Sequence, residues 1–318
     1  MEEKIEKITP LTNAKASINE IEWIIPLHFP FDWGLKLKFT TLPEKPTPCI
    51  IKHDIWMRAL RINKKLIPII VRSTGKIEKP KPIISTLKPF STEKRNIIGF
   101  VFNFHGIKDA SALYDFMDKD PILKKIKGKL YGFGKASLMS ATVFEGVVKA
   151  IIQQQISFKV AESITANLVK RYGERIKFHE EYLYEFPSAE RLANLSVTEL
   201  RKSGLSWKKA EYIKEFSSAV SNGFNPEDLR NKDTKKIIEI LTSFKGIGNW
   251  SAELVMVASM GLNVIPADDL GVRKAISHFY FKDKLQSSET IRKFAENKFG
   301  EFMGDCIVYM LMAYRMKL

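Results

Sequence analysis

Two short motifs in the last third of the chain carry residue types that could bind an anion and supply a reactive carboxylate. The first, Gly246-Ile247-Gly248, lies between two segments with helical spacing of apolar residues. Glycines let the backbone turn sharply at positive φ, so that amide groups approach a ligand that a Cβ atom would block. The helix that follows begins with unpaired N–H groups at the positive end of its dipole. The motif therefore indicates a phosphate-binding turn, and a plain helix end followed by a tight turn is the alternative.

The second motif, Asp268-Asp269, stands directly before a predicted helix. An aspartate at a helix N-terminus caps the unpaired amides and complements the dipole. That function accounts for one of the two acids and leaves the other available for acid–base or electrostatic chemistry.

The segments that must position these motifs are predicted to be helical. From Ser111 onward apolar residues recur at helical spacing, and a stripe that includes Phe144, Val148 and Ile152 predicts one or two buried helices over 142–172. Further helices are predicted at 112–116, after Asp120-Pro121, and at 189–194, 197–202, 208–220, 234–243, 250–260, 270–278, 288–298 and 306–316.

The residues before Ala110 have a different pattern, in which short apolar runs alternate with polar residues. Strands are predicted at 35–39, 55–62, 66–71 and 96–104. Prolines at 43, 46, 48, 80, 82 and 89 exclude long helices from this region. We therefore predict an α+β protein of two domains, an N-terminal antiparallel β-sheet domain over 1–110 followed by an all-helical domain over 111–318.

The composition limits the classes of function. The 318 residues carry a formal net charge of +15, which favours a polyanionic partner, although solvated surface lysines also explain it. Cys49 and Cys306 are the only cysteines, too few for a disulfide framework, a thiolate zinc site or an iron–sulfur cluster. The N-terminal MEEKIEKITPL is charged where a signal peptide is apolar, and no long apolar run follows. We expect an intracellular, cytoplasmic protein that does not enter a membrane.

The hairpin segment LTSFKGIGNWSAEL (241–254) resembles the helix–hairpin–helix motif of the base-excision DNA glycosylase superfamily. Members carry a catalytic aspartate about twenty residues beyond the hairpin, in a frame of Asp-x-(Gly/His/Asn)-apolar-(x)-Arg type, and Asp269-Leu270-Gly271-Val272-Arg273 is similar to it. FEGVVKAIIQQQIS (144–157), SGLSWKKAEYI (203–213) and PFDWGLKLKF (30–39) resemble further family segments in the expected order. The resemblance therefore spans most of the chain.

The resemblance implies a monofunctional DNA glycosylase of the alkylation-repair branch, similar to 3-methyladenine DNA glycosylase II. Bifunctional members place a lysine two residues after the second hairpin glycine, and that amine forms a Schiff base with the sugar. This chain has Trp250 there. We expect it to excise alkylated purines such as 3-methyladenine without lyase activity.

The resemblance also assigns residues. Asp269 is the expected catalytic carboxylate, with Asp268 as the helix cap and the second candidate. Substrate contacts are expected from Trp250, Gln154 and Leu254, although core packing also explains Trp250. The DNA contacts are expected from Lys245, Gly246, Ile247, Gly248, Asn249, Gln155, Lys208 and Lys209, with Gln155 as the wedge that fills the space of the flipped base. A polar helix end also explains the glutamines, and an exposed basic helix start also explains the lysines.

No cofactor is expected to be required, but a monovalent cation, Na⁺ or K⁺, is expected on the backbone carbonyls of Thr242, Phe244 and Ile247. The family often has Gly where Gln153 stands and a Trp or Arg-Ser signature where Gly304-Asp305-Cys306-Ile307 stands, so the pocket wall differs. The expected partner is double-stranded DNA with a damaged base, bound by a monomer. The alternatives are a glycosylase for oxidised or deaminated bases, and a non-catalytic helix–hairpin–helix DNA-binding module.

Overall fold

The computed structural model describes residues 19–318, and its N-terminal part forms a five-stranded antiparallel sheet. The strands are β1 (Glu20–Ile24), β2 (Ile50–Lys52), β3 (Ile55–Ile62), β4 (Lys65–Thr74) and β5 (Lys81–Leu87). Their order across the sheet is β1-β5-β4-β3-β2. Asn63 and Lys64, which join β3 to β4, both have positive φ, as a two-residue hairpin requires. The predicted strands at 55–62 and 66–71 are confirmed as β3 and as part of β4.

The predicted strand at 35–39 is wrong, because the chain forms α1 (Trp33–Leu37) at this point. The carboxylate of Asp32 accepts a hydrogen bond from Leu35 N at 2.9 Å and so begins the helix. An alternation over five residues is too short to exclude a single helical turn when a capping aspartate precedes it.

The predicted strand at 96–104 is also wrong, because it lies in α2 (Lys94–His105). Ile97, Val101 and Phe104 lie on one face of this helix and share a core cluster with the side chains of the sheet. The β-branched and aromatic composition favoured a strand, but burial of this helical face against the sheet overrides that preference.

The helical half begins with α3, and its helices bury two separate apolar cores. A short helix, η1 (Lys88–Glu93), precedes α2 and lies beside the sheet. The elements of the helical half are, in chain order, α3 (Ser111–Asp118), α4 (Pro121–Lys129), α5 (Val143–Gln153), α6 (Phe158–Tyr172), α7 (Ala189–Ala193), α8 (Val197–Arg201), α9 (Trp207–Ser221), η2 (Pro226–Asn231), α10 (Thr234–Thr242), α11 (Asn249–Val255), η3 (Met256–Met260), α12 (Leu270–Tyr280), α13 (Ser288–Phe299), η4 (Gly300–Phe302) and α14 (Met303–Arg315). Each predicted helix is present, with ends that move by a few residues.

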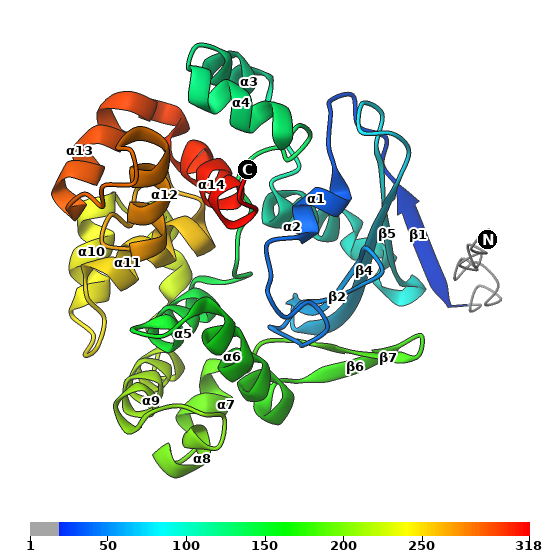
Figure 1. Ribbon diagram of the computed structural model, residues 1–318. Coiled ribbons are helices and arrows are strands. Elements are labelled where there is room, and N and C mark those ends of the chain that lie inside the picture. The colour runs from blue at the N-terminus through cyan, green and yellow to red at the C-terminus, as the bar shows by residue number, and fades with distance from the viewer. Residues whose placement is uncertain (1–18) are drawn as a thin grey trace, which may run out of the picture.

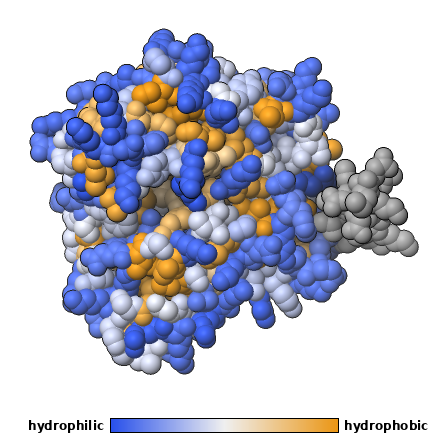
Figure 2. Space-filling view, viewed as in Figure 1, coloured by the Kyte–Doolittle hydropathy of each residue, from blue (hydrophilic) through white to orange (hydrophobic). Residues whose placement is uncertain are grey.

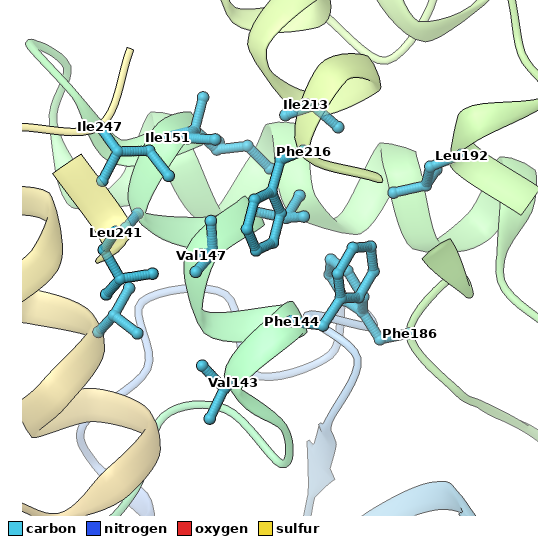
Figure 3. Close-up of a cluster of buried hydrophobic side chains, with 14 of the residues drawn as sticks. Val143, Phe144, Val147, Ile151, Phe186, Leu192, Ile213, Phe216, Leu241 and Ile247 are labelled. Carbon is cyan, nitrogen blue, oxygen red and sulfur yellow. The ribbon is translucent and has the colours of Figure 1, made fainter. Parts of the chain in front are cut away.

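The first helical core, which we call the hairpin core, is built by α5 to α11 around α5. Figure 3 shows Val147 of α5 between Leu241 and Ile247 on one side and Phe216 on the other. The second, which we call the terminal core, is built by α3 and α4 together with α12, α13 and α14. In Figure 1 the terminal-core helices occupy the upper half of the helical part, and α5 to α9 lie below them. The chain therefore crosses between the two cores twice, before α5 and after η3.

The helical half also contains a two-stranded hairpin, β6 (Arg175–Phe178) and β7 (Glu181–Tyr184), so it is helical with one exception. Phe178 and Leu183 of this hairpin pack on Met57 and Ala59 of the sheet. The two halves are joined further by a fully buried ion pair between Arg58 of β3 and Glu145 of α5, with 2.7 Å between Nη2 and Oε2. The predicted fold class, a β-sheet domain followed by a helical domain, is confirmed.

No helix in the described part of the chain is both long and apolar enough to cross a membrane. The charged N-terminal segment MEEKIEKITPL lies outside the described residues.

Because α2 packs on the sheet and α3 packs in the terminal core, the backbone passes from the sheet half to the helical half between His105 and Ser111.

Candidate active site at the glycine hairpin

The glycine hairpin lies between α10 and α11, and its two glycines have different functions. Gly246 has φ +82°, and a Cβ atom there would lie only 2.1 Å from the ring of Tyr212. Gly248 has ordinary backbone angles and open space around it, and it is the N-cap of α11 without a capping side chain. Ile247 between them is buried in the hairpin core, as the sequence predicts. The first-turn amides of α11 are thus left available to an anion at an exposed corner.

Asp269 lies at the start of α12 and uses both of its carboxylate oxygens. Oδ1 accepts a hydrogen bond from Val272 N at 3.0 Å, and Oδ2 accepts one from the indole Nε1 of Trp250 at 3.3 Å. Gly271 leaves room for this arrangement, because a Cβ atom there would lie 3.0 Å from Oδ1. The sequence reasoning expected Trp250 and Asp269 to meet, and the structure brings them together.

The prediction that Asp268 caps the helix is wrong. Its side chain is exposed, and α12 begins at Leu270, so Asp269 is the capping residue. A carboxylate has two oxygens, and the cap occupies only one of them. Asp269 therefore caps α12 through Oδ1 and keeps Oδ2 directed at Trp250.

The loop after α5 contains the three glutamines, and the structure separates their functions. Gln154 was expected to contact substrate or DNA, but its amide Nε2 donates to Gly246 O at 2.7 Å and to Ser251 Oγ at 3.0 Å. It therefore fixes the hairpin against α5 instead of projecting outward. Gln155, the next residue, is exposed and has φ +56°, an uncommon angle for a residue with a side chain. Gln155 stays the predicted wedge residue.

The expected DNA contact of Lys209 is also corrected, because its ammonium group turns toward α5 and does not project to solvent. Nζ donates to Ile152 O at 2.8 Å and to Gln154 O at 2.7 Å, and partial burial lowers the pKa of this lysine. It satisfies carbonyl groups at the C-terminal end of α5, which have no partner within the helix. Lys208, its neighbour, is exposed, as are Lys245 and Asn249 at the hairpin.

The remaining predicted site residues lie on the hairpin itself or behind it. Leu254 is half-buried against the hairpin core, one turn along α11 from Trp250. Of the three carbonyls expected to hold a cation, that of Phe244 accepts a hydrogen bond from Ile247 N at 3.1 Å and keeps one lone pair. Within residues 19–318 no cluster of three or more His, Cys, Asp or Glu side chains is placed to hold a metal ion.

Two residues of the site were missed by the sequence reasoning. Tyr212 packs where Gly246 would have a side chain, and Ser251 accepts the hydrogen bond from Gln154. The signal for Tyr212 was weak, because a tyrosine at helical spacing is usually a core residue. Ser251 is a polar residue on the first turn of a buried helix, and such a residue requires a partner, so its burial was the available signal.

The site lies where the hairpin core meets the terminal core. Trp250 lies on α11 of the hairpin core, whereas Asp269 caps α12 of the terminal core. Figure 2 shows the face of the molecule hollowed near its centre, in the region between α14 above and α5 below in Figure 1. A carboxylate and an indole held together beside an exposed turn, whose first amides have no partner within the helix, form a site that can stabilise positive charge next to an anion.

Comparisons with known proteins show the family of the chain. Residues 148–301 match the HhH-GPD superfamily of base excision DNA repair proteins, and residues 22–77 match the AfAlkA-like, TATA-box binding protein-like domain. The structure of the 3-methyladenine DNA-glycosylase from Archaeoglobus fulgidus superposes with a TM-score of 0.87 and is 39% identical, covering 93% of this chain and 99% of that one. The DNA-3-methyladenine glycosylase of Bacillus subtilis is 24% identical over 264 residues, 81% of this chain and 86% of the relative. DNA-3-methyladenine glycosylase 2 of Escherichia coli is 26% identical over 231 residues, 70% of this chain and 75% of the relative.

The fold and the site therefore define a helix–hairpin–helix protein with an N-terminal sheet domain. The chain belongs to the HhH-GPD superfamily of base excision DNA repair proteins.

Proposed function

We propose that this protein is a monofunctional DNA glycosylase that flips an alkylated purine, such as 3-methyladenine, out of the duplex and hydrolyses its N-glycosidic bond. The observation that carries the proposal is the contact between Asp269 Oδ2 and Trp250 Nε1 beside the exposed turn at Gly248. The names of the similar proteins, which are 3-methyladenine glycosylases, support the choice of substrate.

The chemistry follows from the charge that develops on the sugar. Cleavage of the bond leaves positive charge on C1′ and its ring oxygen, and the fixed Asp269 carboxylate stabilises it. The same carboxylate can orient the attacking water or accept its proton. A purine alkylated on a ring nitrogen is cationic and leaves readily, so a separate general acid is dispensable, and the π face of Trp250 attracts that cation.

DNA is held at the same corner. A phosphate binds the amides after Gly248, and Lys245 and Lys208 add positive charge, while Gln155 fills the space that the flipped nucleotide leaves. Flipping costs a few kcal/mol and costs least for a damaged base, which contributes to selectivity. A Na⁺ or K⁺ ion on the hairpin carbonyls would strengthen the phosphate contact. In this function the protein acts as a monomer on double-stranded DNA in the cytoplasm, and no other cofactor takes part.

The lyase reaction is absent from the proposed mechanism. It requires an amine that attacks C1′ and forms a Schiff base. The residue beside Asp269 is Trp250, whose indole nitrogen is not a nucleophile and already donates its hydrogen to the carboxylate.

The test is a base-release assay over duplexes that each carry one lesion: an alkylated, an oxidised or a deaminated base. We expect release of 3-methyladenine by the wild type and at least a hundredfold slower release by Asp269→Asn, with DNA binding retained. Release of only oxidised or deaminated bases would assign a different substrate to the same site. Binding without any release would reduce the protein to a DNA-binding module.

A further inference from the structure

Glu253 is a buried carboxylate close to the site that the mechanism does not use. It lies on α11 and is 6% exposed. Its Oε1 accepts a hydrogen bond from Arg292 Nη2 of α13 at 2.7 Å, and its Oε2 is buried without a partner among the described residues. A carboxylate taken out of water costs free energy unless its ion pair is well placed, so a retained one calls for a function.

The guanidinium of Arg292 makes a second contact that leads toward the site. Nη1 donates to Ile265 O at 3.2 Å. Ile265 lies in the connection between η3 and α12, four positions before Asp269, and it is buried. This connection is a tight succession of turns, in which Ile265 O also accepts from Ala267 N and Pro266 O accepts from Asp269 N. A displacement of Ile265 is therefore passed on to Asp269.

Glu253 and Trp250 lie three residues apart on α11, so they are on the same face of that helix. Two bridges thus run from this face to the connection that ends at Asp269. One is the bond from the Trp250 indole to the Asp269 carboxylate, and the other runs from Glu253 through Arg292 to Ile265 O. The bonds from Val272 N and from the Trp250 indole orient the carboxylate itself. The bridge through Arg292 holds the backbone that carries Asp269, and so fixes its distance from α11.

We infer that Glu253 and Arg292 are positioning residues, which hold Asp269 at its working distance from Trp250 and from the sugar. The inference rests on the proposed function, because positioning matters only where Asp269 acts on a substrate. Misplacement of a reacting group by about 1 Å can cost up to a hundredfold in rate, so a partial loss of this attachment is expected to cost about tenfold.

The charges around Glu253 add a dependence on pH. Burial raises the pKa of its carboxyl group, the Arg292 guanidinium opposes that rise, and the negative charges of Asp268 and Glu296 add to it. Protonation on the acid side weakens the ion pair. The wild type therefore loses this part of its rate as pH falls, and a variant that already lacks the ion pair has no such part to lose.

The experiment compares Glu253→Gln, Arg292→Met and the double variant in single-turnover excision of 3-methyladenine, with DNA affinity and Tm measured on each. Glu289→Gln is the matched control, since this residue pairs with Lys293 on the outer face of α13, where both side chains are more than 70% exposed. We expect each single variant to be about tenfold slower with DNA affinity within twofold of wild type, and the control to be unchanged. The double variant should be no slower than either single one, because both act through one attachment, and Glu253→Gln should lose less rate on acidification.

Wild-type rates in Glu253→Gln would overturn the inference, and so would additive losses in the double variant. A fall in rate matched by proportional losses of DNA affinity and Tm would show a structural function only. If the wild type itself releases no base, the proposed function fails, and this result is distinct because it appears before any variant is compared.

Discussion

The indole nitrogen of Trp250 lies 3.3 Å from Oδ2 of Asp269, so the helix after the glycine hairpin is joined directly to the residue that begins the next long helix. The bond orients the carboxylate, because the indole N–H approaches one of its two oxygens from a fixed direction. It also limits the indole to one rotation.

Trp250→Phe removes this donor and keeps an aromatic ring. We expect excision of 3-methyladenine to slow about tenfold, a loss typical of one hydrogen bond to a charged group, while DNA affinity stays within twofold. Single-turnover rates and binding to an abasic duplex measure the two quantities. An unchanged rate would mean that the indole N–H does not orient Asp269.

Borohydride should trap no covalent complex between the wild-type protein and lesion-bearing DNA. Trapping requires a Schiff base, and the residue in contact with Asp269 is an indole that cannot form one. Denaturing gel electrophoresis after reduction measures the adduct, with a bifunctional glycosylase as the positive control. An efficient adduct would contradict the monofunctional mechanism.

Alanine at the two hairpin glycines should have different effects. Gly246→Ala places a methyl group 2.1 Å from the Tyr212 ring at φ +82°, so it should destabilise the fold by about 2 kcal/mol or more. Gly248→Ala has open space and ordinary backbone angles, so its stability should stay within about 0.5 kcal/mol of wild type. Because the new methyl group lies at the exposed corner, DNA affinity should nevertheless fall. Denaturant unfolding and DNA titration measure the two effects, and equal loss of stability at both positions would refute this account.

Arg58→Met should destabilise the protein by about 3 kcal/mol, because it leaves the fully buried Glu145 without its main counter-ion. Burial by itself would raise the pKa of Glu145, but Arg58 and Lys149 outweigh it and hold that pKa below its ordinary value. Arg61→Met on the same strand is the control, since its ion pair with Glu174 is exposed and should contribute less than about 1 kcal/mol. Equal effects of the two substitutions on the urea midpoint would contradict the prediction.

Lys36 should make stability depend on pH. Its side chain is buried, with Nζ donating to Phe133 O and Lys135 O, and burial lowers its pKa to about 7. In the unfolded chain the amine binds its proton up to an ordinary lysine pKa, so between these two values the unfolded state holds more protons. The contribution of Lys36 is therefore least favourable below pH 7 and becomes more favourable as pH rises above it. Between pH 6.5 and 9.5 the unfolding free energy of the wild type should rise relative to that of Lys36→Met. A difference between the two proteins that stays constant with pH would exclude this titration.

The sequence predicted the parts of the site that depend on local geometry. Two glycines around Ile247 predicted a turn with one buried side chain, and helical spacing predicted the helices on both sides of it. The proximity of Trp250 and Asp269 came from family resemblance, because no periodicity in the chain relates residues on two different helices. Which acid caps α12 depends on where that helix takes its first turn, and two adjacent aspartates made both starts equivalent in sequence.

The errors concern polar residues that turn inward. Gln154 and Lys209 are residue types that are expected at a DNA-binding surface. Gln154 instead donates to the carbonyl of Gly246 in the hairpin, and Lys209 donates to the carbonyl of Ile152 near the end of α5. A sequence does not show which carbonyls lack partners until the helices are packed. The strand prediction at 96–104 was wrong for a related reason. The composition of this segment favoured a strand, but its apolar side chains pack on the sheet from one face of a helix.

The terminal core is discontinuous along the chain, since α3 and α4 precede the hairpin core and α12 to α14 follow it. During synthesis on the ribosome the helices of the hairpin core can therefore pack together while α12 to α14 of the terminal core are still untranslated. Because Asp269 caps α12, and α12 packs on α14, we expect Asp269 to reach its place only after the residues of α14 have emerged. A chain that ends before α14 is therefore expected to form the glycine turn without placing the carboxylate beside it.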